Sequence, residues 1–391
     1  MSNSSVSNSL VSTTDVLSQQ ARRSGSALRH LCSPRTWWSA AVTLNRGNTA
    51  IAPAVRVGVA VGLVLVVGGL LGHRDLAGFA ALGSLTSAFC RADPYRVRLP
   101  RLLVVGAAVV LYVGFGAILG ASGSSIVVQV VAMSLAAGLA ALLVPALRLM
   151  GPGAVVLIFA AAGAAGFATT AGDVGRLVVA AVIGAFVGIA ASLAPWARDA
   201  LRGDDRHRIA ERVNVLADLR RVFNRRLLMR STRIVAACAI AATIAVAAGL
   251  QHPMWAAMGA LASLQGVDYH ATVHRGVQRL LGNVGGAVVA IALLALPLGY
   301  WGAVALIVVL QVAAEVLATV NYALCSLAVT PMALLLTGLG AGLTADIAVD
   351  RVADTAVGVV CGVVLAALTV ARHEFAGSGP IPVVSSSASS R

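Results

Sequence analysis

The chain has 391 residues, of which 59% are hydrophobic and only 11% are charged, and its mean hydropathy is +0.89. Soluble domains carry about 25% charged residues, so this composition excludes an ordinary soluble protein and indicates a multi-pass membrane protein. The formal net charge of +14 does not indicate a nucleic-acid partner, because all 29 basic residues are arginines that gather in a few segments between apolar runs. That distribution is typical of the cytoplasmic loops of membrane proteins.

The two ends of the chain are polar and rich in serine. Residues 1–50 have no apolar core of the signal-peptide type, and we expect them to form a disordered cytoplasmic tail. Residues 373–391 are predicted to form a second cytoplasmic tail.

Twelve apolar segments follow one another between the tails and predict an all-α transmembrane bundle of about twelve spans. The first six lie at 54–71, 76–90, 102–121, 126–147, 153–171 and 176–196, and the second six at 233–249, 253–267, 280–297, 302–323, 325–343 and 352–371. A span needs about 20 helical residues. The second and eighth segments have only about 15, so whether they cross completely is left open.

Arginine placement predicts the orientation. The linker at 198–232, the N-terminal tail and the segment 90–101 hold most of the arginines, and all three fall on the cytoplasmic side if the N-terminus is cytoplasmic. We therefore predict an inner (plasma) membrane protein with both termini cytoplasmic. The 198–232 linker has apolar residues at helical spacing, and we expect it to bind anionic lipid headgroups on the inner leaflet.

The chain also repeats itself, which divides it into a first membrane repeat at 51–197 and a second at 233–372. The matching stretches are FAALGSLTS (79–87) with WAAMGALAS (255–263), RLLVVGAAVV from Arg101 with RLLGNVGGAVV from Arg279, VVQVVAM (127–133) with VLQVAAE (309–315), and GRLVVAAVIG (175–184) with DRVADTAVG (350–358). Two parallel repeats of six spans predict a shared cavity near the midplane of the membrane. Glu315 is matched with Met133, so the acid is present in only one repeat.

Glu315 is the first candidate for a functional residue, because no other charge occurs between Arg279 and Asp346. Gln311, Glu315, Thr319 and Tyr322 fall on one face of a helix, and with the neighbouring Asn321 they form a predicted proton-coupling or substrate group. A carboxylate in an apolar span is costly to ionise, so it can bind and release a proton as its surroundings change. The alternative is a protonated glutamate that holds two helices together by a hydrogen bond.

The segment 267–286, VDYHATVHRGVQRLLGNVGG, is interpreted as a cytoplasmic loop that leads into a helix. An electropositive mouth for an anion is predicted there, formed by His270, His274, Arg275 and Arg279, with Arg279 at the helix N-terminus. The alternative is ordinary anchoring by positive charge on the cytoplasmic side. Gly282 and Gly286, four residues apart, are expected to permit tight helix packing.

Arg351 and Asp354, at the outer end of the last span, are predicted to form an ion pair and to belong to an outer gate. The alternative is an arginine that reaches the membrane surface beside a local partner.

The sequence contains none of the motifs HExxH, GxSxG or the phosphate-binding loop, so no enzyme, cofactor or energy-supplying nucleotide site is expected. The cysteines at 32, 90, 238, 325 and 361 are scattered without metal-ligand spacing, so no metal is expected and they are interpreted as small core residues.

Several of these residues resemble the fusaric acid resistance (FUSC) family, which is related to aromatic acid exporters and to plant aluminium-activated malate transporters. The resemblance covers residues 233–370 closely and the first half weakly. It rests on Arg275, Arg279, Gly282, Gly286, Asn321, Tyr322, Thr330, Pro331, Arg351, Asp354, Thr355 and Gly358. It implies export of small organic anions, driven by protons or through a channel, and a homodimer. Larger members carry long soluble regions between and after the membrane halves, whereas the linker between the halves here has about 35 residues.

The leading hypothesis from the sequence is therefore a proton-coupled exporter of small organic acids, aromatic acids above all, with protons and an organic anion as its partners. An anion channel of the same superfamily and a non-transporting protein of envelope assembly are the alternatives.

Overall fold

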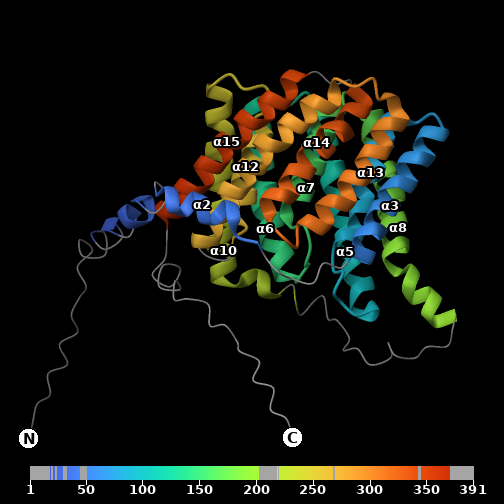
Figure 1. Ribbon diagram of the computed structural model, residues 1–391, viewed down its shortest axis with the longest axis horizontal. Helices are drawn as coiled ribbons and strands as arrows, with labels where there is room; N and C mark the ends of the chain where they lie inside the picture. The colour runs from blue at the N-terminus through green and yellow to red at the C-terminus, as the bar shows by residue number, and fades with distance from the viewer. Residues whose placement is uncertain are drawn as a thin grey trace, which may run out of the picture.

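The computed structural model describes residues 33–44, 51–201, 220–266, 269–341 and 345–369, together with residues 18, 21–22, 24–29 and 218. Within these residues every regular element is a helix, and the helices form one bundle (Figure 1). Nine described helices are long and apolar enough to cross a membrane. The chain is thus a multi-pass helical membrane protein, as its composition predicts.

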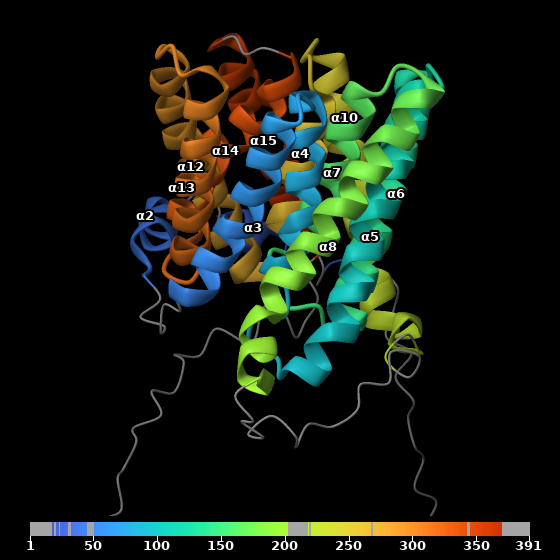
Figure 2. The same cartoon turned by 90° about the vertical axis from the view of Figure 1, so that its right-hand side faces the viewer.

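The helices fall into two groups of six, separated by the partly described linker (Figures 1 and 2). The first group is α3 (Ile51–Leu70), α4 (Arg74–Ser84) with a 3₁₀ turn η1 (Leu85–Ala88), α5 (Tyr95–Ala121), α6 (Ile126–Ala146), α7 (Ala154–Phe167) and α8 (Ala171–Leu201). The second group, preceded by a 3₁₀ turn η3 (Arg220–Phe223), is α10 (Arg225–Ala247), α11 (Pro253–Leu264), α12 (Tyr269–Leu294), α13 (Gly299–Leu317), α14 (Tyr322–Ala341) and α15 (Ala345–Leu368).

Each predicted apolar segment overlaps one of these helices, but three helices are too short to cross the membrane alone. α4, α7 and α11 have 11, 14 and 12 residues. At a rise of about 1.5 Å per residue they span roughly 16–21 Å of a hydrocarbon core about 30 Å thick. Polar or irregular chain must complete their passage, which is tolerated only where it is buried in protein or faces a water-filled cavity. Twelve complete crossings therefore stay a prediction.

Two predicted boundaries are wrong, and both errors concern candidate site residues. The segment around 267–286 is not a loop, because α12 already begins at Tyr269, so Arg279 lies in the third turn of a helix and not at its N-terminus. The predicted span 302–323 is interrupted, because α13 ends at Leu317 and α14 begins at Tyr322. Asn321 explains this break: its side-chain oxygen accepts hydrogen bonds from the backbone N–H groups of Ala323 and Leu324 and so caps α14.

The two groups of helices make matching internal contacts. α4 packs on α8 at Gly184 and Gly188, where an added Cβ would collide with the backbone of α4. α11 packs on α15 in the same way at Gly358 and Gly362. Only glycine lets two helix backbones approach so closely. Two glycines four residues apart thus perform the same packing task in α8 and in α15.

The two groups also contact each other through equivalent helices. α3, the first helix of its group, packs on α13, the fourth helix of the other group. In the same way α10, the first helix of the second group, packs on α6, the fourth helix of the first. At the second contact the Ser231 hydroxyl donates a hydrogen bond of 2.8 Å to the Gly138 carbonyl. Space between the groups is therefore walled by helices of both.

A short helix from the N-terminal segment, α2 (Pro34–Val42), lies against α12 at the side of the bundle (Figure 2). The Gln278 side chain donates a 2.8 Å hydrogen bond to the Ala40 carbonyl, and the Asn321 side chain donates to the carbonyls of Ala41 and Thr43 at 3.3 and 2.9 Å. Ala40 and Ala41 belong to the last turn of α2 and Thr43 is its C-cap residue, so these carbonyls have no intrahelical donors. The prediction of a disordered tail up to residue 50 is therefore wrong for residues 34–42.

The remaining predictions about the polar segments are only partly covered. Residues 202–217 and 219 of the predicted linker and the C-terminal tail at 373–391 lie outside the described residues. The last part of the predicted linker, from Arg225 onward, belongs to the long helix α10.

Candidate functional site

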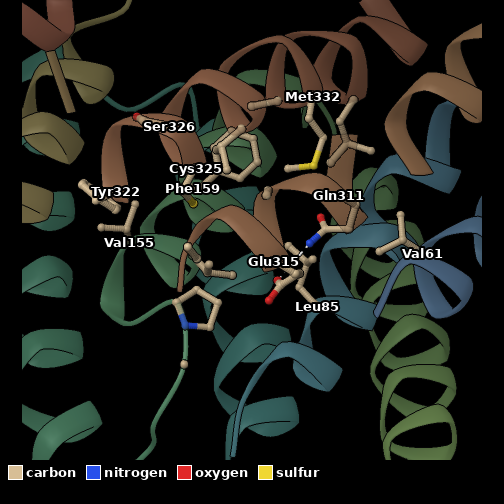
Figure 3. Close-up of a pocket in the computed structure, with 18 of the residues that line it drawn as sticks. Val61, Leu85, Val155, Phe159, Gln311, Glu315, Tyr322, Cys325, Ser326 and Met332 are labelled. Carbon is tan, nitrogen blue, oxygen red and sulfur yellow. Dashed lines mark hydrogen bonds between the residues drawn. The ribbon is translucent and has the colours of Figure 1, made fainter. Parts of the chain in front are cut away.

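A cavity of about 340 Å³ lies between the two groups of helices, where α4 and α13 finish. Its size lies within the range of about 300–1,000 Å³ that is usual for small-molecule sites. The walls are mostly apolar, and Figure 3 shows Val61, Leu85, Phe159 and Met332 around it. Its charged lining residues are Arg91, Arg275, Arg279, Arg351 and Glu315.

Glu315 lines this cavity from the last turn of α13 and is 7% exposed. Its Oε2 lies 2.7 Å from an Nη1 nitrogen of Arg91, and its Oε1 accepts a hydrogen bond of 3.0 Å from Nε2 of Gln311 (Figure 3). Gln311 and Glu315 are one helical turn apart, so both reach the same wall. The isolated acid of the sequence is thus half of a largely buried ion pair.

Arg91 is placed by the irregular chain that follows η1. Cys90 adopts a positive φ of 54°, and its backbone N–H donates to the Met150 carbonyl at 2.6 Å. The Arg98 guanidinium then holds the turn by donating to the carbonyls of Arg91 and Asp93 at 2.6 and 2.8 Å. The break after the short helix α4 therefore presents Arg91 to the cavity.

The sequence predicts Arg91 only as a cytoplasmic charge, not as a partner of Glu315. One signal could have found it. The offset that matches 79–87 with 255–263 places Arg91 opposite Val267, just as another match places Glu315 opposite Met133. Both members of the ion pair are thus absent from the other repeat, and two unmatched residues of opposite charge are natural partners.

Arg275 and Arg279 enter the cavity from successive turns of α12 and share Tyr322 as a partner. The Arg275 guanidinium lies over the Tyr322 ring at 4.4 Å, and Nη1 of Arg279 donates a 3.1 Å hydrogen bond to the Tyr322 hydroxyl. Gly282 and Gly286 continue the same face of α12, and an added Cβ at either would collide with α14. The predicted tight packing at these two glycines is confirmed, and it brings Tyr322 up to the arginines.

Arg351 reaches the cavity from the second turn of α15 and is 4% exposed. Its guanidinium lies 4.7 Å from the Trp255 ring centroid and 5.9 Å from that of Phe159. The predicted ion pair with Asp354 does not form: neither Asp354 oxygen has a hydrogen-bonding partner in the structure, and Nε and Nη1 of Arg351 also have none. At i+3 on α15 the Asp354 side chain is fully buried and does not line the cavity with Arg351.

The arginines of the second repeat differ from their counterparts in the first. Arg101, matched with Arg279, lies 2.7 Å from Asp93, and Arg176, matched with Arg351, lies 2.8 Å from Asp75. In the described part of the chain Arg279 and Arg351 have no such carboxylate partner. Arg101 and Arg176 are thus neutralised by acids, whereas Arg279 and Arg351 are left available to an anion.

Other predicted site residues are arranged differently. Thr319 lines the cavity, but its hydroxyl donates to the Val316 carbonyl at 2.8 Å. Asn321 is 5% exposed, does not line the cavity, and instead caps α14 and holds α2. His270 and His274, in the first turns of α12, are not among the lining residues. Of the four residues predicted to form the electropositive mouth, only Arg275 and Arg279 line the cavity.

The cavity is therefore suited to an organic anion. Four arginines against one glutamate leave three positive charges on a largely apolar wall. Guanidinium groups make strong, often bidentate hydrogen bonds to carboxylates. Among the described residues no group of histidine, cysteine and acidic side chains could hold a metal ion.

Fold and site together define a multi-pass helical membrane protein with a cationic cavity between two groups of helices. Residues 228–365 match the family model described as fusaric acid resistance protein-like, which confirms the family resemblance over α10–α15. No curated protein and no solved structure matches the chain. The family match and the helical bundle fit a membrane transporter.

Proposed function

We propose that this protein is a proton-coupled secondary transporter that exports small organic acids, aromatic acids above all, across the inner membrane. The observation that carries the proposal is the cavity between the two helix groups, where unpaired arginines face an apolar wall beside the Arg91–Glu315 ion pair. The arginines would bind the carboxylate, and side chains such as Phe159 would contact the ring.

The membrane arrangement that goes with this function has three parts: twelve crossings, two parallel repeats and cytoplasmic termini. The matching contacts of α4 with α8 and α11 with α15 support the repeats. The contacts of α3 with α13 and of α10 with α6 support a cavity shared by the two groups. In this orientation the cavity lies toward the cytoplasm, where an exported acid would enter.

The coupling follows from competition for Arg91. An ionised Glu315 occupies one face of the Arg91 guanidinium at 2.7 Å. A proton on Glu315 removes that negative charge, frees Arg91 for the substrate carboxylate and raises the net charge of the lining by one. By linkage, an anion bound there raises the proton affinity of Glu315 by the same free energy. Anion and proton therefore bind together and leave together.

This sign of coupling makes transport electroneutral, since one negative and one positive charge move as a unit. Net export then follows the gradient of the acid itself. Purified protein in liposomes, loaded with 4-hydroxybenzoate, tests the proposal, with protein-free liposomes as the control for leakage of the neutral acid. We expect protein-dependent efflux that is accompanied by protons and is unchanged when the membrane potential is clamped at different values. Efflux equal to the control for a broad panel of aromatic acids would refute the proposal and favour a role in envelope assembly.

An anion channel is the second candidate, and the excess of positive charge in the cavity favours it. A channel would carry the anion alone, so a membrane potential of 100 mV would add about 2.3 kcal/mol per charge to the free energy that drives the anion across the membrane. Currents across planar bilayers that follow the anion gradient and ignore pH would identify the channel. The same measurement separates the two candidates, because electroneutral transport carries no current.

A further inference from the structure

A second cavity, of about 230 Å³, lies at the opposite end of the short helices, where α4 and α11 begin and α7 finishes. Its walls are aromatic, with Phe79, Phe159, Phe167 and Trp255, and its rim carries His252 and Asp75. Phe79 and Phe167 meet edge to face at 5.3 Å, and His252 stacks on Trp255 at 4.3 Å. In the predicted orientation this cavity lies toward the outer side of the membrane; we name it the outer cavity and the first one the inner cavity.

The two cavities share a wall. Phe159 of α7 and Leu336 of α14 line both of them. The Arg351 guanidinium lies at this wall, over Phe159 and over Trp255, which lines only the outer cavity. Phe159, Leu336 and Arg351 are therefore the boundary between the cavities, and we call them the septum.

Arg351 is poorly satisfied in this position. The side chain is more than nine-tenths buried, and its Nε and Nη1 have no hydrogen-bonding partner. The two aromatic faces stabilise the buried cation only in part, and each hydrogen bond that a buried charged group leaves unmade keeps its full desolvation cost. A carboxylate binds a guanidinium through Nε and Nη2 or through Nη1 and Nη2, so it would supply an acceptor to one of these two unpartnered nitrogens and a second bond to Nη2.

We propose that the outer cavity is a second binding compartment for an aromatic carboxylate and that the septum is the barrier through which the anion passes from one cavity to the other. The carboxylate would take the Arg351 guanidinium from its aromatic partners, while the ring of the ligand would stack on the Trp255 face that becomes free. An aliphatic or uncharged ligand could satisfy only one of these two contacts. The inference rests on the proposed function and adds to it the route and the preference for an aromatic ring.

Cysteine accessibility tests the barrier without requiring transport. Cys325 lines the inner cavity, and Gly163 and Gly166 line the outer one, where an added Cβ meets nothing within 4 Å. With the other cysteines replaced by alanine, one protein retains Cys325 and another carries Gly163→Cys with Cys325→Ala. The anionic reagent sulfonatoethyl methanethiosulfonate is then applied to oriented vesicles from one side at a time.

The reagent is compared from the side on which it modifies the Gly163→Cys protein. From that side we expect it to modify Cys325 at least tenfold more slowly than the cysteine at position 163. Phe159→Ala should remove this difference, and Phe186→Ala, at a 72% exposed position of α8, is the matched control that should not. Phe159→Val serves if the alanine variant does not purify as a single species. Equal rates at both positions in the presence of Phe159, a difference that survives Phe159→Ala, or no modification of the Gly163→Cys protein from either side would each overturn the assignment.

Ligand protection tests the compartment. Benzoate should slow modification of the Gly163→Cys protein, and benzyl alcohol and cyclohexanecarboxylate should do so at least fivefold less well at equal concentration. Arg351→Gln should abolish protection, and Arg351→Lys should retain part of it. Equal protection by benzyl alcohol would remove the role of Arg351. Absent flux through an otherwise intact barrier would refute the proposed function alone, whereas flux without any barrier would refute only this inference.

Discussion

The Arg91–Glu315 ion pair gives the sharpest test of the coupling, through the variant Glu315→Gln. Glutamine keeps the shape of the protonated acid and can still accept the hydrogen bond from Gln311. It removes the charge that competes with a substrate for Arg91. We expect the variant to bind an aromatic anion more tightly than the wild type at neutral pH, and with an affinity that no longer depends on pH.

The size of the effect follows from the burial of the pair. Its nitrogen and oxygen are 2.7 Å apart, with the glutamate side chain 8% and the arginine side chain 24% exposed. An exposed pair is worth about 0.5 kcal/mol, and breaking a fully buried one costs about 3–5 kcal/mol. A value of about 1.5 kcal/mol lies between these limits and corresponds to about a tenfold change in Kd.

Calorimetric titration of detergent-purified protein with 4-hydroxybenzoate between pH 5.5 and 8 measures the affinity for the anion and its dependence on pH. The His252→Gln background removes the titration of the outer rim. In the wild type the affinity should rise as the pH falls, by at most tenfold per pH unit for one proton bound with each anion. In liposomes, Glu315→Gln should convert electroneutral efflux into efflux that follows the membrane potential.

Two controls belong to this test. Glu315→Asp keeps the charge one methylene farther from Arg91 and should retain partial pH dependence. Asp173→Asn removes an acid that lies outside both cavities and should behave like the wild type. A wild-type affinity that is constant with pH, or a glutamine variant with full pH dependence, would refute the reasoning and leave Glu315 as a residue that only holds helices together.

Three further predictions concern other parts of the molecule. Burial lowers the pKa of His252, so this imidazole binds a proton less well in the folded protein than in the unfolded chain, and thermal stability should fall as the pH drops through about 6.5. In melting scans from pH 8 to 5, His252→Gln should flatten this decline, and an unchanged profile would contradict the prediction. Asn321→Ala should destabilise the protein by about 1–2 kcal/mol, because α14 loses its cap, and it should speed hydrogen exchange in α2. Asn321→Asp should affect only the hydrogen exchange. Slow exchange in α2 in both variants would show that the Asn321 contacts do not hold α2 in place. A cysteine at the exposed Ser122 should react with impermeant reagents from outside the cell, and one at the exposed Arg225 should not. The reverse labelling would invert the predicted orientation.

The sequence alone determined the class of the protein and the positions of its helices. Apolar runs of membrane-spanning length can hardly adopt anything but helices, because backbone polar groups in lipid must be satisfied within the segment. Each predicted run therefore overlaps a helix of the structure. The four-residue spacing of Gly282 and Gly286 likewise predicts close helix packing, and in the structure an added Cβ at either position would collide with α14.

Helix boundaries near polar residues required the structure. The sequence predicts that the span begins at residue 280, whereas α12 already begins at Tyr269 and contains Arg275 and Arg279. There the two arginines face a cavity and a tyrosine, so they can lie within the helix without contact with lipid. The break at 318–321 was missed because the cap at Asn321 is a single short polar residue within an apolar run.

Which charges share one cavity was decided only by tertiary structure. Glu315 stands alone in the sequence, but the distant Arg91 reaches it because a short helix ends in an irregular turn at that depth. Arg351 and Asp354, three residues apart, were expected to pair, but the close packing of α11 on α15 buries the acid away from the cavity that the arginine lines. Spacing along a helix fixes which residues can share a face, whereas the partner of a buried charge is chosen by whatever chain the fold brings against it.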